Sequence, residues 1–235
     1  MGGYEFWVEY YKHLRKSGID LLKIDNQGSL GSSLSGILAL DNAIENHYLM
    51  QQGAAYSQNL TILNCMCMAS DNKIYWSKSN ASRVSDDFYP GKPDLARHQI
   101  TQCTMNSLWY SQFCWPDHDM FQTNSPDWNP LILIHMVSGG PVYIADEIDE
   151  TKASVVNKIS FPDGRLPRLD RPAIPTNDII FGDTKIDTPC KMWNYHDLTG
   201  WGRIYYYYVA NMIENKEILP VSIKMADMGE LAKIS

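Results

Sequence analysis

Short apolar runs that each end in an acidic or amide side chain limit the fold of this chain more than any other feature of its sequence. Residues 19–25 and 60–66 have the length and composition of strands buried on both faces, and residues 81–85 are a weaker example. Stretches with helical periodicity follow at 35–54 and 97–111. Strands that alternate with helices predict parallel pairing through crossover helices, and so an α/β fold.

The alternation extends over most of the chain. Further predicted elements are an amphipathic helix at 4–17, an apolar helix at 131–137, a strand at 141–145 and a short helix at 151–158. After about residue 165 prolines crowd the sequence, helical periodicity disappears, and antiparallel strands are predicted around 192–194 and 202–209. We therefore expect an α/β part at 1–165 and a β-rich part at 166–235.

Polar side chains gather where the predicted strands end, at Asp25, Asn64, Asp87 and Asp146. In a (β/α)8 barrel the active site forms at this carboxyl face, and a doubly wound open sheet also binds ligands there. A glycine-rich phosphate loop does not follow any of these strands, which weakens the nucleotide-binding alternative.

Charge and cysteine content exclude several classes of function. The net charge is −7 and the pI about 5.3, so the chain lacks the basic surface of a nucleic-acid-binding protein. No apolar run approaches the roughly 20 residues of a membrane helix, and the first residues do not resemble a signal peptide, so a cytoplasmic protein is expected. The five cysteines are irregularly spaced and predict reduced, buried thiols. No cofactor is expected.

Lys23 and Asp25 form the first candidate pair. Alternation along a strand places both side chains on one face, roughly 6.5–7 Å apart along the chain. A carboxylate beside an ammonium group stays ionised, as a nucleophile at an anomeric carbon must. The competing interpretation is a structural ion pair in which the aspartate caps the following loop, and K-x-D alone favours that alternative.

Arg83, Asp86 and Asp87 form the second candidate group. Two adjacent carboxylates raise the pKa of one of them, and a raised pKa suits a general acid. The alternatives are a helix N-cap and a divalent-metal site, for which Asp117 and Asp119 would supply further oxygen ligands. The sequence lacks the ligand spacing of an EF-hand loop.

Trp115, Asp117 and Asp119 form the third group. An aromatic ring that packs on the apolar face of a sugar, beside carboxylates that bind its hydroxyls, is typical of carbohydrate sites. His118 alternates with the two aspartates and is expected to support the site or to be exposed, rather than to act as a base. The absence of a G-x-S-x-G string leaves acyl-transfer chemistry with little support.

Six strings taken together resemble glycoside hydrolase family 36, in its branch of raffinose synthases, seed imbibition proteins and related microbial α-galactosidases. They are LKIDNQ at 22–27, RVSDDFYP at 83–90, WPDHDMF at 115–121, SGGPVYIAD at 138–146, FPDGRL at 161–166 and KMWN at 191–194. No single string is decisive, but their order along the chain is specific to the family.

The resemblance implies retaining cleavage or transfer of α-galactosyl groups, with an oligosaccharide substrate and a sugar acceptor as partners. The nucleophile of the family's K-x-D string falls on Asp25, and the acid/base of its R-x-x-x-D string falls on Asp87. Asp86 is the alternative acid/base if the register differs by one residue. Substrate contacts are expected from Lys23, Arg83, Asp86, Asn26, Cys65, Trp115, Asp117 and Asp119.

The resemblance also implies a (β/α)8 barrel followed by a C-terminal β-sandwich. The Asp25 strand corresponds to about the fourth of eight, so the chain is expected to hold strands about 4–8 and an incomplete β-domain, as a fragment of a longer protein. Two rival hypotheses remain open at this point: a sugar-binding remnant without activity, and a metal-dependent barrel enzyme. Hydrolysis and transfer are not distinguished.

Overall fold

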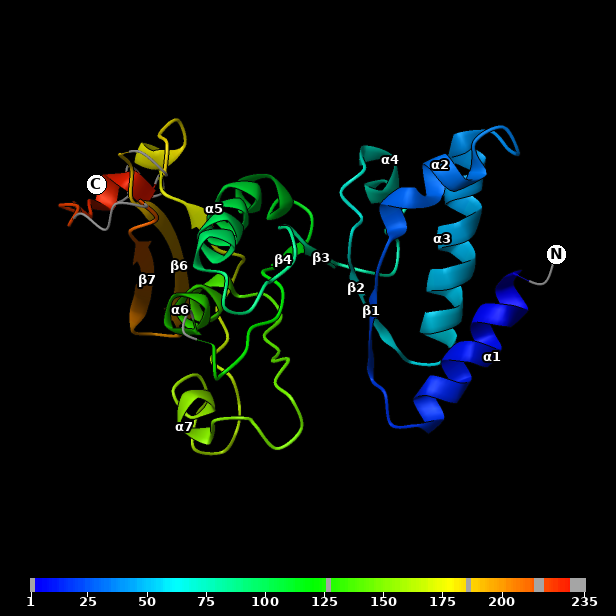
Figure 1. The fold of residues 1–235 in the computed structure, drawn as a ribbon, viewed down its shortest axis with the longest axis horizontal. Helices are drawn as coiled ribbons and strands as arrows, with labels where there is room; N and C mark the ends of the chain where they lie inside the picture. Colours follow the sequence, from blue (N-terminus) through cyan, green and yellow to red (C-terminus); the bar gives the residue numbers. More distant parts are fainter. Residues whose placement is uncertain (1–2, 126–127, 185–186, 214–217, 229–235) are drawn as a thin grey trace. The chain divides into compact units, whose positions relative to one another are not determined.

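The computed structural model describes residues 3–125, 128–184, 187–213 and 218–228 (Figure 1). The chain divides into two compact units, Met1–Arg83 and Val84–Ser235. The content is mixed α/β, with parallel strands in the first unit and an antiparallel sheet in the second. Within these described ranges, every helix is too short or too polar to cross a bilayer.

Parallel strands form the sheet of the first unit. Strand β1 (Leu21–Ile24) pairs with β2 (Thr61–Asn64), which pairs with β3 (Ala81–Arg83). The strands predicted at 19–25, 60–66 and 81–85 are therefore confirmed in place and pairing, although each is shorter than predicted. Polar side chains lie at or just after the carboxyl ends of these strands, at Asp25, Asn64 and Arg83.

Two helices cover this sheet. Figure 1 shows α1 (Gly3–Lys16) lying alongside α3 (Leu40–Ser57), and the two are in contact. Their apolar faces pack with the strands in one core, which contains Tyr11, Leu22, Ala54, Ala55, Leu60 and Ile62. Burial of these side chains in a shared core is the main term that stabilises the unit.

The helix predicted at 35–54 begins later than predicted. The chain after β1 instead forms the short helices η1 (Gln27–Ser29) and α2 (Leu30–Leu34), and α3 begins only at Leu40. Gly36 interrupts the helical pattern because its φ of 78° lies in the left-handed region. A further short helix, α4 (Ser70–Lys73), lies between β2 and β3.

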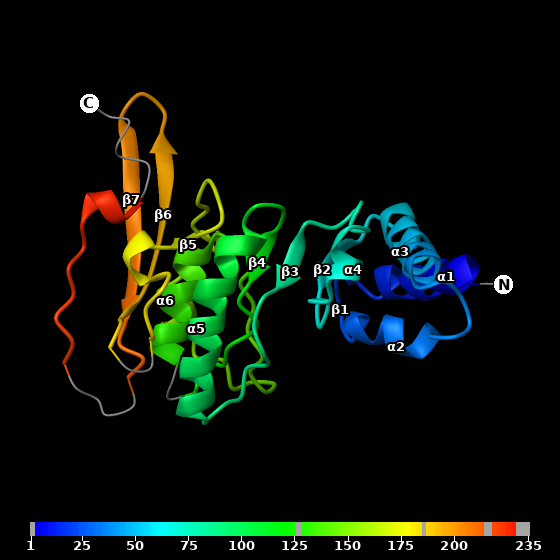
Figure 2. The same cartoon turned by 90° about the horizontal axis from the view of Figure 1, so that it is seen from above.

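The second unit packs two helices against an antiparallel sheet. The sheet has the order β5 (Ile174–Pro175), β6 (Cys190–Leu198), β7 (Gly202–Ala210), and Figure 2 shows α5 (Pro93–Tyr110) and α6 (Trp128–Ser138) beside it. The shared core includes Phe88, Ile100, Phe121, Leu131, Ile134, Met192 and Tyr208. The remaining elements are β4 (Trp115–Asp117), α7 (Ala153–Val156), η2 (Asn177–Ile179) and η3 (Met225–Met228). The boundary expected at residue 165 stays a prediction.

The strand predicted at 141–145 is wrong. Only an isolated parallel bridge joins Ile144 to Phe121, and the Ala145 N–H donates to the Phe121 carbonyl at 3.0 Å. Pro141 has no N–H to donate to a ladder, which disfavours a regular strand at this position. The apolar run therefore passes through the unit as a loop.

The Gly139-Gly140 pair fits a close approach between two backbones. Gly139 has φ 74°, and a Cβ built on Gly140 would lie 2.1 Å from the carbonyl oxygen of Pro116. A side chain cannot be accommodated there unless the backbone of β4 moves. The glycines thus allow α6 to end directly against the strand that carries Asp117.

We expect Gly140→Ala to destabilise the protein by at least about 2 kcal/mol, because the new methyl group overlaps a backbone atom. Gly53→Ala in α3 is the matched control. Its Cβ would meet only Tyr4, at 3.6 Å, and the helix propensity of alanine should stabilise the protein by roughly 0.5–1 kcal/mol. Urea unfolding of both variants measures the difference. Equal stabilities would contradict the close approach.

Candidate active site

The carboxyl ends of the parallel strands bring together predicted site residues of the first unit. The register pairs Ile24 with Asn64 and Asn64 with Ser82, so the residues that follow them, Asp25, Cys65 and Arg83, lie at one edge. In-register residues of parallel strands point to the same face. Lys23, two residues before Asp25, shares that face.

The Cys65 thiol lies close enough to Lys23, Asp25 and Arg83 for each of them to affect its pKa. Burial raises its pKa to about 12, the charges of Arg83 and Lys23 act in the opposite direction, and a hydrogen bond with Asp25 raises the pKa further. Each of the three side chains therefore interacts electrostatically with one buried thiol. Arg83 is only 6% exposed, whereas Asp25 is exposed. The result is a carboxylate that faces solvent beside two cationic side chains.

The chain turns sharply directly after Asp25. Asn26 adopts φ 56°, a left-handed conformation that asparagine tolerates better than most residues, and its N–H donates to Asp25 Oδ1 at 2.8 Å. The Gly28 N–H then donates to the Met66 carbonyl at 2.6 Å. These bonds fix the loop that follows the carboxylate.

A buried amide network holds the same loop from the opposite face of the sheet. The Gln27 amide donates to the Ile24 carbonyl at 2.8 Å and to Asn64 Oδ1 at 3.1 Å. Tyr48 on α3 donates its hydroxyl to Gln27 Oε1 at 2.5 Å. The side chain of Gln27 is only 2% exposed, so these bonds satisfy polar groups that water cannot reach. The sequence analysis missed this network.

In the second unit, Asp86 and Asp87 both have exposed side chains, but α5 engages Asp86 closely. The Asp86 N–H donates to Gln102 Oε1 at 2.7 Å, and Gln102 Nε2 donates to Asp86 Oδ2 at 2.8 Å. His98, one turn earlier on α5, has its Nε2 3.5 Å from the same carboxylate oxygen. Asp86 is therefore held by two side chains of α5, and the assignment of the acid/base to Asp87 stays a prediction.

Asp117 and Asp119 lie inside the second unit, with exposed fractions of 0% and 1%. Tyr143 donates its hydroxyl to Asp117 Oδ2 at 2.8 Å and lies 3.3 Å from Asp119 Oδ1. Burial, followed by the two carboxylates, raises the pKa of Tyr143 far above its usual range, so the phenol remains a donor. Phe88 donates its N–H to Asp119 Oδ2 at 2.8 Å. Both aspartates were expected to contact substrate, and in the structure they bind groups of the protein itself. Trp115, two residues before Asp117 in the sequence, is half-buried.

His118 lies between these aspartates in sequence and is also buried. Burial, with a smaller effect of His135, lowers the pKa of His118 to about 3, so the imidazole is neutral at physiological pH. Its Nε2 lies 3.3 Å from Ser107 Oγ. His118 is therefore buried rather than exposed, and its supporting role at the site stays a prediction.

The buried His118 should make stability fall as the solution becomes acidic. Between pH 6.5 and 3 the unfolded chain binds a proton at this residue that the folded chain does not, so folding is penalised increasingly as the pH decreases. At pH 5 the loss is about 2 kcal/mol, from 1.36 kcal/mol per pH unit. We expect His118→Leu to remove this part of the pH dependence, measured by urea unfolding at pH 7 and pH 5. The same pH dependence in both proteins would contradict the lowered pKa.

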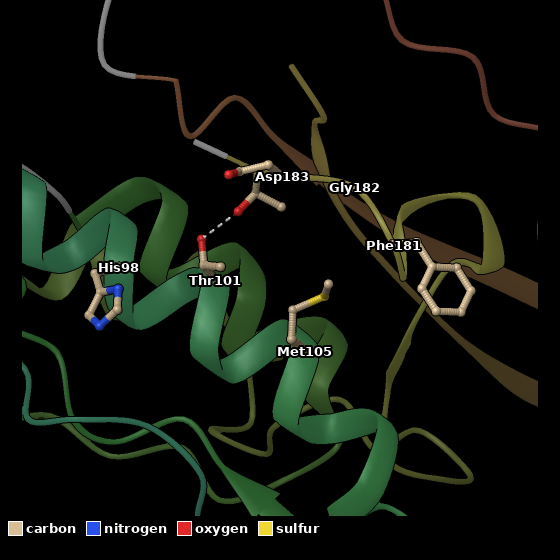
Figure 3. A pocket seen from close by; sticks show the side chains of 7 residues that line it. His98, Thr101, Met105, Phe181, Gly182 and Asp183 are labelled. Carbon is tan, nitrogen blue, oxygen red and sulfur yellow. Dashed lines mark hydrogen bonds between the residues drawn. The ribbon is translucent and has the colours of Figure 1, made fainter. Parts of the chain in front are cut away.

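A hollow of about 390 Å³ opens on the second unit between α5 and the chain at 181–184 (Figure 3). It is lined by His98, Thr101, Met105, Phe181, Gly182, Asp183 and Thr184. Thr101 Oγ1 and Thr184 Oγ1 form a hydrogen bond of 3.1 Å across it. The predicted site residues do not line this hollow, although His98 also faces Asp86.

In the part of the chain that the structure describes, no three histidine, cysteine, aspartate or glutamate side chains gather as a metal site requires. The residues that the sequence analysis missed are Gln27, Tyr48 and Gln102. Apart from the local bond of Gln27 to Ile24, their hydrogen bonds join positions 16 to 37 residues apart in the chain. The only local signal was an amide side chain two residues after a candidate carboxylate, at Gln27.

The sequence matches one protein family and several of its curated members. A family model described as "Raffinose synthase or seed imbibition protein Sip1" matches residues 2–212. The "Probable galactinol--sucrose galactosyltransferase 6" of Arabidopsis thaliana is 32% identical over 84% of this chain and 27% of its own length. The "Galactinol--sucrose galactosyltransferase" of Oryza sativa subsp. japonica is 30% identical over 83% of this chain and 27% of its own length.

A third relative, the "Stachyose synthase" of Pisum sativum, is 31% identical over 50% of this chain and 15% of its own length. The chain therefore spans about a quarter of the length of the first two relatives and less of the third. The matched segment includes both candidate carboxylates of the sequence analysis, because the family match extends from residue 2 to residue 212.

Proposed function

Because this chain belongs to the raffinose synthase and seed imbibition protein family, we propose that it carries the catalytic carboxylates of a retaining enzyme that acts on α-galactosides. In this proposal Asp25 is the nucleophile and Asp87 is the acid/base. Lys23 and Arg83 bind hydroxyl groups of the galactosyl unit. Further proposed substrate contacts are Asn26, Cys65, Trp115, Asp117 and Asp119.

The observation that carries the proposal is the arrangement around Asp25. An exposed carboxylate lies at the carboxyl end of a parallel strand, beside a buried thiol. The charges of Lys23 and Arg83 also affect the pKa of this thiol. Ligands of parallel α/β sheets bind outside this end of the strands. Cationic neighbours keep such a carboxylate available for attack on an electrophilic carbon, which is what covalent glycosidic catalysis needs.

The proposed reaction has two steps. In the first, a carboxylate oxygen of Asp25 forms a bond to the anomeric carbon while the bond to the leaving oxygen breaks, and Asp87 gives its proton to that oxygen. In the second, Asp87 takes the proton of an acceptor hydroxyl, whose oxygen displaces Asp25 from the anomeric carbon. Two inversions leave the product with the α configuration of the donor.

We propose transfer to a sugar acceptor as the main reaction, with hydrolysis as its competitor. Support comes from the relatives, which are named galactinol–sucrose galactosyltransferases and a stachyose synthase. Their names imply an α-galactosyl donor and a sugar acceptor. The same two carboxylates serve both reactions, because water and a sugar hydroxyl attack the same intermediate.

We further propose that the chain forms the part of a (β/α)8 barrel that contains strands about 4–8, followed by the beginning of a β-rich domain at residue 166. Support for the barrel comes from the parallel pairing of β1, β2 and β3, with α3 as a crossover helix between the first two. The face with Lys23 and Asp25 would then point into the barrel.

The proposed function is tested by incubating the chain with galactinol or an aryl α-galactoside, with and without sucrose, and with and without a chelator. We expect galactosyl transfer to sucrose and slower release of galactose, both insensitive to the chelator. Turnover that requires a metal would contradict the two-carboxylate mechanism. Binding of the donor without any turnover would show a sugar-binding protein instead.

A further inference from the structure

Asp87 lies between two residues whose backbones are held from different sides of the second unit. On the preceding side, the amide of Gln102 binds Asp86 twice: it accepts the Asp86 N–H at 2.7 Å and donates to the Asp86 carboxylate at 2.8 Å. The Ser85 hydroxyl donates to the Asp86 carbonyl at 2.9 Å. The N–H, the carbonyl and the carboxylate of Asp86 are therefore all bonded.

On the following side, Phe88 is held by both its backbone and its ring. Its N–H donates to Asp119 Oδ2 at 2.8 Å, and its side chain is only 8% exposed within the core. Asp119 is itself fixed, because its N–H donates to Asp117 Oδ1 at 3.2 Å and its carbonyl oxygen lies 2.6 Å from His135 Nε2. The segment cannot shift toward α5 or away from it without breaking one of these bonds.

We propose that Gln102 is a positioning residue for Asp87, acting through its double hydrogen bond to Asp86; this inference rests on the proposed role of Asp87 as acid/base. The Gln102–Asp86 pair is called the clamp below. The clamp holds the Asp86 backbone and carboxylate against α5, and so fixes the point of the chain from which the Asp87 side chain extends. It also assigns different tasks to two adjacent aspartates, one structural and one chemical.

Positioning of this kind affects rate more than binding. A general acid transfers its proton only within hydrogen-bond reach of the leaving oxygen, roughly 2.6–3.2 Å. A displacement of about 1 Å can lower the rate about 100-fold. Loss of the clamp should therefore lower kcat with little change in KM. In the first step, which kcat/KM measures, the loss should be large for a poor leaving group, which needs the proton, and small for an activated aryl group, which leaves without it.

The variant Gln102→Leu tests the clamp in the whole chain. We expect the Asp86 amide to exchange its hydrogen about tenfold faster, because the bond to Gln102 Oε1 is gone. With an alkyl α-galactoside, kcat should fall about 10- to 100-fold at unchanged KM. With a nitrophenyl α-galactoside, kcat/KM should fall less than about threefold, because it measures formation of the intermediate and this leaving group needs little protonation.

Gln112→Leu is the matched control, since Gln112 lies just beyond α5 and, among the described residues, its amide bonds only to Leu108 and Ser111. It should leave amide exchange at Asp86 and both rates unchanged. Unchanged exchange at Asp86 in Gln102→Leu would overturn the clamp. An equal loss of kcat/KM for both substrates would overturn the positioning role. Absence of turnover in the unchanged protein overturns the proposed function instead, while the exchange measurement still decides the clamp.

Discussion

Asp25→Ala is expected to lower kcat/KM for an aryl α-galactoside by at least about 10⁴-fold, because the variant lacks the group that forms the covalent intermediate. Asp25 is exposed at the end of β1, so its truncation removes little packing. The free energy of unfolding should change by no more than about 0.5 kcal/mol. Initial rates and urea unfolding, measured on the same preparation, separate loss of chemistry from loss of fold.

Asp20→Ala is the control for this variant. Asp20 is exposed just before the amino end of the same strand, where it pairs with Arg15, and surface ion pairs contribute about 0–1 kcal/mol. Its removal should leave the rate within about twofold, because the residue is at the end of β1 opposite to Asp25. An Asp25→Ala variant that keeps more than a tenth of the activity would remove Asp25 from the proposed mechanism.

Asp87→Ala should show a different signature from Asp25→Ala. Turnover of a poor leaving group should fall about 10²–10⁴-fold, the contribution of a general acid, while an activated leaving group should still react to form the intermediate. Azide should then restore turnover, because this anion attacks the galactosyl-Asp25 intermediate without a general base. The product should be α-galactosyl azide, with the configuration of the donor retained, as seen by proton NMR.

Asp86→Ala distinguishes the two neighbouring aspartates in the same assay. It should lose the carboxylate half of the clamp, while the backbone N–H at position 86 can still donate to Gln102, and show a moderate decrease in rate. Azide should not restore that rate, because the acid/base is still present. Rescue of Asp86→Ala and not of Asp87→Ala would move the acid/base by one residue, to the alternative that the sequence left open.

The parallel strands could be predicted because their signal is local. Residues 19–25 and 60–66 are apolar over nearly their whole length, and the structure places β1 and β2 within them. Helix α5 was predicted to start at 97 but begins at Pro93, since proline fits the first turn of a helix, where its missing N–H has no intrahelical acceptor. The strand at 141–145 was predicted from composition alone, and Pro141 is the residue that disfavours it.

The surroundings of the candidate carboxylates could be predicted only in part. Lys23 and Asp25 share a strand, so their common face follows from alternation. The contacts of Gln27 with Tyr48 and of Asp119 with Phe88 join residues 21 and 31 positions apart, and no spacing rule of a single sequence indicates them. The aromatic and acidic side chains at 115–119 predicted an open sugar surface. In the structure Asp117 and Asp119 are buried and contact the Tyr143 hydroxyl, which lies in a different segment of the sequence.

The covalent intermediate on Asp25 tests the central claim most directly. A fluorinated α-galactosyl fluoride should galactosylate the chain, because fluoride leaves readily while the ring fluorine slows breakdown of the intermediate. Peptide mass spectrometry after protease digestion then locates the sugar. The proposed mechanism predicts a galactosyl ester on the peptide that contains Asp25, absent from Asp25→Ala and accumulating more in Asp87→Ala. A galactosyl group on another residue, or release of β-galactose from the α-donor without any labelled peptide, would contradict it.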